Sequence, residues 1–256
     1  MNVRRSMFAF CAAAAIATAM SSALPAQRMR DTLAWTSQNQ TFRDAGCSGR
    51  ECSSAELSWP DFGARPGPRA RVNDFLLISM VVVEGGRKPS LRRRNIANVG
   101  KEFLDAARTG SSAGMPWDAK RTISVVCNTP TRVLLRSDEY SFTGGAHGNF
   151  ASLFAAFVPG TGAPVSERAM VPTTLRTAIL PVAERAFRRE RELSPTGSLM
   201  EAGYTFKDDK FEVSTAFLAV CGSSLFVHWN VYAIAPYAAG PIHLTIPLDS
   251  VPTLRR

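Results

Sequence analysis

Apolar residues fall along this chain in short blocks whose periods differ. The first strong block, residues 74–85 (DFLLISMVVVEG), is almost continuously apolar and rich in β-branched side chains. Such a run, bounded by polar residues, is typical of a strand that is buried on both faces. The sequence therefore predicts a β-strand over residues 74–85.

Two later segments have the period of a helix. In residues 95–110 apolar side chains recur every three or four positions, Asn95 suits an N-cap, and Gly110 suits the end of the helix. Residues 174–193 repeat the pattern, but Pro181 falls inside the apolar stripe. Because proline lacks the N–H that an interior helical position donates, we expect it to kink or divide this second helix.

The remaining blocks resemble strands that follow one another with short turns between them. These strand-like segments are residues 120–128, 131–142, 151–159 and much of 204–251. Strands that cluster in this way, with few helices between them, favour an α+β fold over an alternating α/β fold. We predict antiparallel-rich sheets with two main helices.

The N-terminus has the order of a secretory signal peptide. Arg4 and Arg5 precede an apolar run from about Met7 to Met20, and small residues follow. The run is shorter than the roughly 20 apolar residues that a membrane-spanning helix needs. We predict that residues 1–26 are a signal peptide, that no membrane span remains after its removal, and that the protein is periplasmic or secreted.

Residues 27–71 follow the predicted signal peptide and are polar, with many Gly, Pro and Ser residues. No helix or strand period extends through them. They are predicted to form an N-terminal arm or loop region.

Four cysteines remain once Cys11 leaves with the signal peptide: Cys47, Cys52, Cys127 and Cys221. An even number in an exported chain favours disulfides, and four cysteines allow three pairings. Cys47 and Cys52 flank a short polar loop, whereas the other two lie in strand-like text, so we predict the pairs 47–52 and 127–221. Neither the spacing nor the three scattered histidines favours a zinc site, and no metal or cofactor is predicted.

The chain is basic, with a formal net charge of +9, or +7 without Arg4 and Arg5. A basic exported protein can meet anionic envelope polymers or lipid head groups, although the charge can also serve solubility alone. The run from Glu184 to Glu192 mixes both signs at helical spacing and indicates a solvated helix face. Basic residues are not interleaved with stacking aromatic residues, so nucleic-acid binding is not expected.

Three short motifs invite a chemical interpretation. His147 follows a Gly-Gly turn, where we expect its ring to hydrogen-bond the backbone of its own turn, since no neighbour supplies a nucleophile or an orienting group. Ser112 lies in GSSAG, but a helix precedes this motif where a nucleophile elbow requires a strand. Asp208 and Asp209, flanked by lysines, are predicted to form a hairpin turn.

A second unusual stretch lies near the C-terminus, at residues 230–251 (NVYAIAPYAAGPIHLTIPLDSV). Two prolines and a glycine separate strand-like segments, which predicts a change of direction between strands. Trp229, Tyr232 and Tyr237 surround it. We expect these rings to fill the core at the bend; the alternative is contact with sugar rings or a protein partner.

The two motifs together resemble an exported domain family. YSFTGGAHGN (residues 140–149) is similar to its Tyr-x-x-Thr-Gly-Gly-Ala-His signature, and VYAIAPYAAGP (residues 231–241) to its C-terminal signature. The family includes the extracytoplasmic part of the RsiV anti-sigma factor and the N-terminal region of the PdaC peptidoglycan deacetylase. The resemblance covers about residues 72–251 and implies two associated halves, which we place at residues 72–165 and 166–256.

The resemblance also implies a function. RsiV-like domains recognise lysozyme, and PdaC-like domains accompany a separate catalytic domain, of which this chain shows no sign. We therefore expect a non-enzymatic binding module of the cell envelope whose partner is a lysozyme-like protein, another peptidoglycan-active protein or peptidoglycan. Tyr140, His147 and Tyr237 are the candidate contact residues. The alternatives are an envelope hydrolase that uses His147 and a secreted structural or antigen-like protein.

Overall fold

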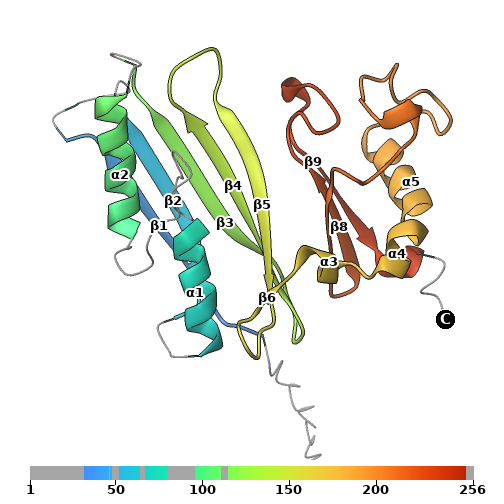
Figure 1. Cartoon of the computed structure of the whole chain (residues 1–256), viewed down its shortest axis with the longest axis horizontal. Coiled ribbons are helices and arrows are strands. Elements are labelled where there is room, and N and C mark those ends of the chain that lie inside the picture. The colour runs from blue at the N-terminus through green and yellow to red at the C-terminus, as the bar shows by residue number, and fades with distance from the viewer. Residues whose placement is uncertain are drawn as a thin grey trace, which may run out of the picture.

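The computed structural model contains two sheets that lie beside each other, with helices packed against both (Figure 1). It describes residues 32–45, 47, 52–63, 67–79, 96–110 and 115–251. The predicted signal peptide lies outside these ranges. Among the helices that they contain, none combines the length and the apolar character needed to cross a membrane.

The first sheet has six strands in chain order, from β1 to β6. Neighbouring strands are antiparallel except β2 and β3, which are parallel because the two helices α1 and α2 lie between them in the chain. The elements are β1 (Thr36–Arg43), β2 (Ser54–Asp61), α1 (Pro68–Ser79), α2 (Ile96–Thr109), β3 (Asp118–Asn128), β4 (Val133–Phe142), β5 (Asn149–Phe157) and β6 (Pro164–Val165). In Figure 1 both helices cover the same face of this sheet.

The predicted strand at residues 74–85 is wrong over its first part, because α1 continues to Ser79. Val72 and Leu76, four residues apart and so on one face of a helix, are both buried, and they join Phe62 in the core of this half. The packing of Val72 and Leu76 in this core outweighs the strand propensity of the segment. The rest of the segment, beyond Ser79, lies outside the described residues.

The predicted arm at residues 27–71 is also different from expectation, since it supplies β1, β2 and the start of α1. The side chains of β1 are exposed throughout except for half-buried Phe42, so this strand has no alternating apolar pattern that sequence reasoning could detect. In β2, by contrast, Ala55 and Leu57 point into the core.

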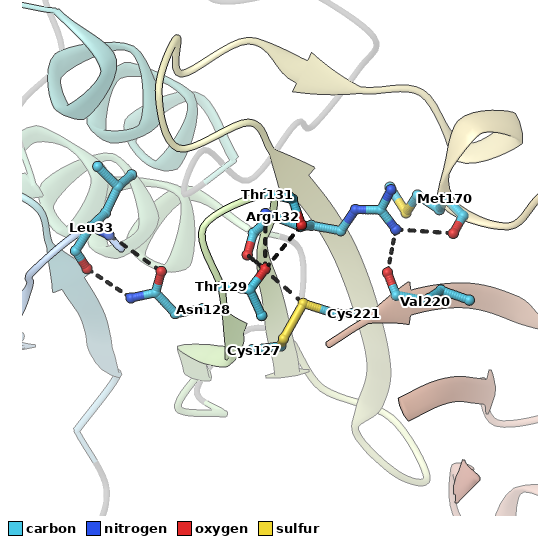
Figure 2. The surroundings of a disulfide bond; sticks show 9 residues. All are labelled: Leu33, Cys127, Asn128, Thr129, Thr131, Arg132, Met170, Val220 and Cys221. Atoms are coloured by element: carbon cyan, nitrogen blue, oxygen red, sulfur yellow. Dashed lines mark hydrogen bonds between the residues drawn. A yellow bond between two sulfur atoms is a disulfide. The ribbon is translucent and has the colours of Figure 1, made fainter. Parts of the chain in front are cut away.

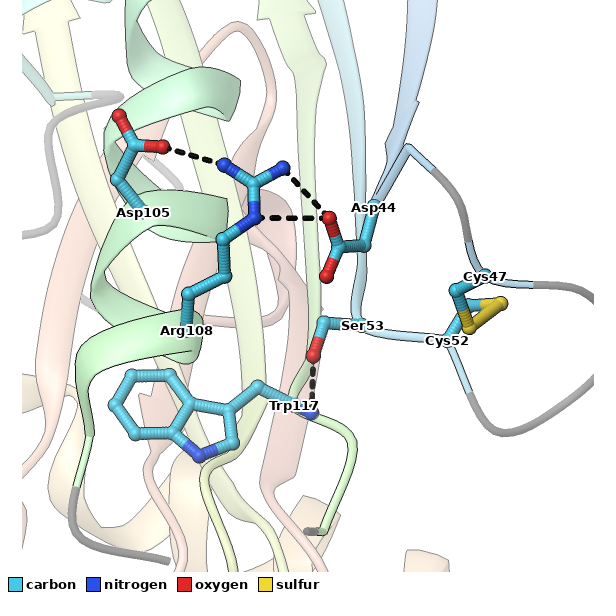
Figure 3. Close-up of polar contacts among 7 residues, drawn as sticks. All are labelled: Asp44, Cys47, Cys52, Ser53, Asp105, Arg108 and Trp117. Carbon is cyan, nitrogen blue, oxygen red and sulfur yellow. Dashed lines mark hydrogen bonds and ion pairs between the residues drawn. A yellow bond between two sulfur atoms is a disulfide. The ribbon is translucent and has the colours of Figure 1, made fainter. Parts of the chain in front are cut away.

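The β1–β2 connection is held by several contacts (Figure 3). The predicted disulfide Cys47–Cys52 closes this connection. The Ser53 hydroxyl accepts the backbone N–H of Trp117 at 2.9 Å, which ties the start of β2 to the residue before β3. The helix α2 is attached at the same place, because its Arg108 bonds Asp44 at 2.6 Å; within the helix, Arg108 also bonds Asp105 at 2.8 Å. Exposed ion pairs of this kind contribute little stability each, so the Arg108–Asp44 pair orients the helix more than it stabilises it.

The second half combines a three-stranded antiparallel sheet, in the order β7-β8-β9, with short helices. Its elements are α3 (Glu167–Met170), α4 (Thr173–Ala178), α5 (Leu180–Glu190), β7 (Phe217–Cys221), β8 (Ser224–Trp229) and β9 (Ile242–Pro247). Three 3₁₀ turns lie at Lys207–Asp209, Tyr237–Ala239 and Leu248–Ser250. Pro181 stands in the first turn of α5 and divides α4 from α5, as predicted.

The α+β prediction is confirmed, and β3, β4 and β5 match the three central predicted strands closely. Between α5 and β7, however, residues 204–216 contain no strand. The predicted hairpin turn at Asp208 and Asp209 is therefore wrong. Asp209 instead accepts the backbone N–H of Met200 at 2.7 Å, and this bond is the main reason why the pKa of Asp209 lies below its ordinary value.

The two halves are joined covalently by the predicted disulfide Cys127–Cys221, which links β3 to β7 across 94 residues of sequence (Figure 2). Beside it, the Arg132 guanidinium donates to backbone carbonyls of the second half, those of Met170 (3.0 Å) and Val220. The disulfide thus attaches the end of β3 to β7, and Arg132, just before β4, attaches the β3–β4 connection to both α3 and β7.

Candidate functional site

The two signature loops, far apart in sequence, lie against each other where the halves meet. The first loop joins β4 to β5 and contains His147 and Gly148; the second joins β8 to β9 and contains Tyr237. The Tyr237 hydroxyl donates to the carbonyl of Gly148 at 2.8 Å. Each loop therefore helps to fix the conformation of the other.

His147 stacks on Tyr237, with the ring centroids 4.7 Å apart and the planes 25° apart. Its Nδ1 lies 2.9 Å from the carbonyl oxygen of Gly148, so Nδ1 carries the proton and Nε2 is unprotonated in the neutral ring. The prediction that His147 bonds the backbone of its own turn is confirmed. The side chain is exposed, so one edge of the stacked pair faces solvent.

Tyr140, at the end of β4, is packed against the same glycine. A Cβ at Gly148 would lie 2.3 Å from Cε2 of Tyr140, which is far inside van der Waals contact. Only glycine therefore allows the half-buried Tyr140 ring to lie this close to the loop that carries His147. Here the glycine serves close approach, since its φ is not positive.

Tyr232 completes the group. Its ring centroid lies 5.4 Å from that of Tyr237, and its side chain is 62% exposed. It has a positive φ of 64°, which is uncommon for a residue other than glycine and costs on the order of 1 kcal/mol or more. We call Tyr140, His147, Tyr232 and Tyr237 the aromatic surface. The expectation that the rings near the bend fill the core is correct for buried Trp229 and wrong for Tyr232.

Below the aromatic surface, Asn230 joins the halves through its side-chain amide. Its Oδ1 accepts the backbone N–H of Ser152 at 2.6 Å, and its Nδ2 donates to the Ser152 carbonyl at 3.0 Å. The Asn230 side chain thus makes the two backbone hydrogen bonds that a neighbouring strand would otherwise make with β5. Sequence reasoning missed this residue; the signal was an asparagine directly after the last residue of β8.

Polar and aromatic side chains extend the junction beneath Asn230. The Ser152 hydroxyl donates to Asp138 at 2.6 Å, and Asp138 also pairs with Arg136 at 2.9 Å. Phe154 of β5 stacks on Phe217 of β7 with the centroids 4.1 Å apart. The junction therefore continues from the aromatic surface past Asn230 to the rings of both sheets.

His228 on β8 is the one histidine of the described residues that is buried, with 4% of its surface exposed. Its ring is tilted against Phe154 at 5.0 Å, and neither ring nitrogen has a hydrogen-bond partner. Burial lowers the pKa of His228 below its ordinary value of 6.5. Asn230 gives the strongest opposing effect on this pKa, whereas Arg136 and His243 act in the same direction as burial and Asp138 acts against it.

The lowered pKa of His228 predicts a pH dependence of stability. The unfolded chain binds a proton below about pH 6.5 while folded His228 stays neutral, so stability is complete above this pH and falls as the pH drops through it. We expect His228→Phe to reduce the difference in melting temperature between about pH 7.5 and 5.5, measured by circular dichroism. Met200→Ala, at an exposed residue, is the control and should leave that difference unchanged. An equal pH dependence in wild type and His228→Phe would contradict the prediction.

A groove with a volume of ≈ 510 Å³ runs along the junction, between β5 and β6 on one side and residues 214–217 on the other. Ser152 and Asn230 lie among its lining residues, together with both stacked rings, Phe154 and Phe217. Residues 143–149 do not line it. The groove and the aromatic surface are thus neighbouring but separate features.

The contacts of His147 bear on the hydrolase alternative. Within the described ranges this side chain contacts a backbone carbonyl and an aromatic ring, and no carboxylate or thiol bonds it there. Over the same ranges, no group of three His, Cys, Asp or Glu side chains is arranged to hold a metal ion. Ser112 lies outside the described residues.

Comparison with known proteins supports a fold but not an activity. Residues 171–249 match the family model described as "Protein of unknown function (DUF3298)". No curated protein matches the chain significantly. The finer likeness to RsiV-like and PdaC-like proteins stays a prediction.

Two crystal structures have a similar fold. A DUF3298 family protein from Pseudomonas aeruginosa PAO1 aligns with a TM-score of 0.62 and 21% identity over 86% of this chain and 92% of its own. A DUF3298 family member from Bacteroides fragilis aligns with a TM-score of 0.63 and 16% identity over 86% of this chain and 93% of its own. The chain is thus similar to DUF3298 proteins in fold over most of its length and in sequence over its second half.

Proposed function

We propose that this protein is an exported, non-enzymatic binding module of the cell envelope that uses the aromatic surface to hold its partner. One observation carries the proposal: two loops 89 residues apart bring their rings together and lock each other through the Tyr237–Gly148 hydrogen bond. Exposed rings with little conformational freedom are typical of binding hot spots, because little entropy is lost when they are covered.

The partner that fits best is peptidoglycan. Flat rings offer apolar faces to sugar rings, and the Nε2 of exposed His147 can accept a hydrogen bond from a sugar hydroxyl. The exported chain is basic, with a net charge of +7 once Arg4 and Arg5 are removed, which attracts an anionic polymer and opposes a basic protein such as a typical lysozyme. A lysozyme-like or other peptidoglycan-active protein is the second candidate.

A retention assay tests the proposal. The purified exported protein is incubated at physiological salt with peptidoglycan sacculi and, separately, with immobilised lysozymes. We expect retention on sacculi, and we expect Tyr237→Ala and His147→Ala to weaken it about tenfold each, the equivalent of about 1.4 kcal/mol. Absence of retention on both supports would remove the proposal.

Matched variants separate binding from folding. Tyr237→Phe keeps the ring and loses the bond to Gly148, so it should weaken retention less than Tyr237→Ala does. Met200→Ala, a change at an exposed apolar residue on another loop, should have no effect. Hydrolysis of peptidoglycan fragments or simple esters that disappears in folded His147→Ala would favour the hydrolase alternative instead.

A further inference from the structure

The outer edge of β1 (Thr36–Arg43) has the properties of a pairing surface. The strand order places β1 at one end of the six-stranded sheet, with β2 on its inner side. All of its side chains are exposed except half-buried Phe42. Natural edge strands are normally protected by charges, prolines, bulges or a covering segment.

The first six residues of β1, TSQNQT, include no charge and no proline. The register with β2 runs one-to-one over all eight residues, without a bulge. In a chain of net charge +7 after the loss of Arg4 and Arg5, a flat and uncharged strand is a place where two copies can approach without local repulsion.

The direction of the unpaired backbone groups follows from one hydrogen bond. The N–H of Asp44 donates to the carbonyl of Ser53 at 3.1 Å, so residue 44 points its backbone toward β2. In an antiparallel pair, residues alternate between those that bond the neighbouring strand through their backbone and those that do not. The backbone N–H and C=O groups of the even-numbered residues of β1 therefore face β2, and those of the odd-numbered residues face outward. The outward residues are Ser37, Asn39, Thr41 and Arg43. No strand of the described residues pairs with them.

We propose that β1 pairs with β1 of a second copy of this chain, antiparallel and about a two-fold axis at Asn39. This register places Ser37 of each copy opposite Thr41 of the other. Because the backbone groups of both residues face outward, each of these two opposing positions is a hydrogen-bonded pair. It also places Arg43 opposite Trp35 of the other copy. Trp35 is 41% exposed, so its ring can accept the guanidinium in a cation–π contact.

The resulting dimer has one sheet that continues across two copies. A charged partner would make no ion pair with an uncharged strand. A second copy of the nearly symmetric segment TSQNQT, in contrast, can pair with it in an antiparallel arrangement. This pairing leaves the opposite side of the sheet unchanged, where β5 meets the second half. Self-pairing is therefore compatible with partner binding at the aromatic surface and would present two such surfaces together.

The mass of the purified protein in solution tests the proposal. We expect a dimer by light scattering and sedimentation, and we expect Asn39→Lys to weaken dimerisation at least tenfold, since it places two lysines at the axis. Met200→Lys, at a residue that is 67% exposed and lies in the second half, adds the same charge as a control and should dimerise like wild type. Asn39→Pro, which removes one outward N–H and no bond to β2, should also give monomers.

Two results would overturn the proposal. One is a wild-type protein that stays monomeric as its concentration is raised through the millimolar range. The other is a dimer that persists unchanged in Asn39→Lys and Asn39→Pro while circular dichroism shows both variants folded. That outcome would place the interface on another surface of the chain.

Discussion

Replacing Cys127 and Cys221 together by alanine is expected to lower the free energy of unfolding by about 4–5 kcal/mol. The disulfide closes a loop with a sequence separation of 94, and in the chain-entropy model a loop of this length restricts the unfolded chain by about 4.7 kcal/mol. The variant should lose on the order of 10 °C in melting temperature. Urea unfolding monitored by circular dichroism measures the change.

The environment of the bond makes alanine the right replacement. Cys221 is buried among Leu134, Ala156, Met170 and Ala219, so a serine there would add the cost of a buried hydroxyl to the effect of the lost bond. Alanine leaves only a small gap in this cluster.

The second disulfide supplies a matched control. Cys47 and Cys52 are separated by only 5 residues, so the same model assigns about 2 kcal/mol to their bond. Equal losses in the two double-alanine variants would mean that loop entropy does not govern the Cys127–Cys221 effect. A loss below about 1 kcal/mol would mean that Arg132 and Asn230 hold the halves together without the covalent link.

The sequence predicts what depends on local chemistry. Pro181 divides the helices because it has no N–H to donate, and His147 bonds the carbonyl of the next residue, both of which are properties of a few neighbouring residues. The cysteine pairs follow from a short loop and two strand-like contexts. The resemblance likewise selects Tyr140, His147 and Tyr237, which the structure brings to one surface.

What the sequence does not predict depends on partners that are distant along the chain. The exposed strand β1 has no apolar period, and only its pairing with β2 makes it a strand. Residues 74–79 are helical because Val72 and Leu76 pack into a core to which distant residues of β3, β4 and β5 contribute. The Asn230–Ser152 pair spans 78 residues, and no local pattern announces an amide that bonds the backbone of another strand.

Phe187→Ala is expected to cost about 3–5 kcal/mol, an effect similar to the loss of the long-range disulfide. The side chain of Phe187 on α5 is fully buried, and its ring centroid lies 4.9 Å from that of Tyr204 and 5.8 Å from that of Trp229. Truncation removes these edge-to-face contacts and leaves a cavity between α5 and the second sheet that neighbouring rings cannot fill without leaving their rotamers. Phe187→Leu refills most of the volume and should cost less than half as much.

The location of the damage is part of the same prediction. The two halves have separate apolar cores, and Phe187 belongs to the core of the second half. Trp229 is the tryptophan of that core, while Trp35, Trp59 and Trp117 belong to the first half. The test uses a Phe187→Ala protein in which Trp229 is kept and the three tryptophans of the first half are replaced by phenylalanine. The emission of Trp229 should shift to the red at a lower urea concentration than the one at which the far-ultraviolet circular dichroism signal is lost. If the two transitions occur at the same urea concentration, the halves unfold as one cooperative unit. The disulfide, Arg132 and Asn230 would then couple the halves, so that the loss of one core also unfolds the other.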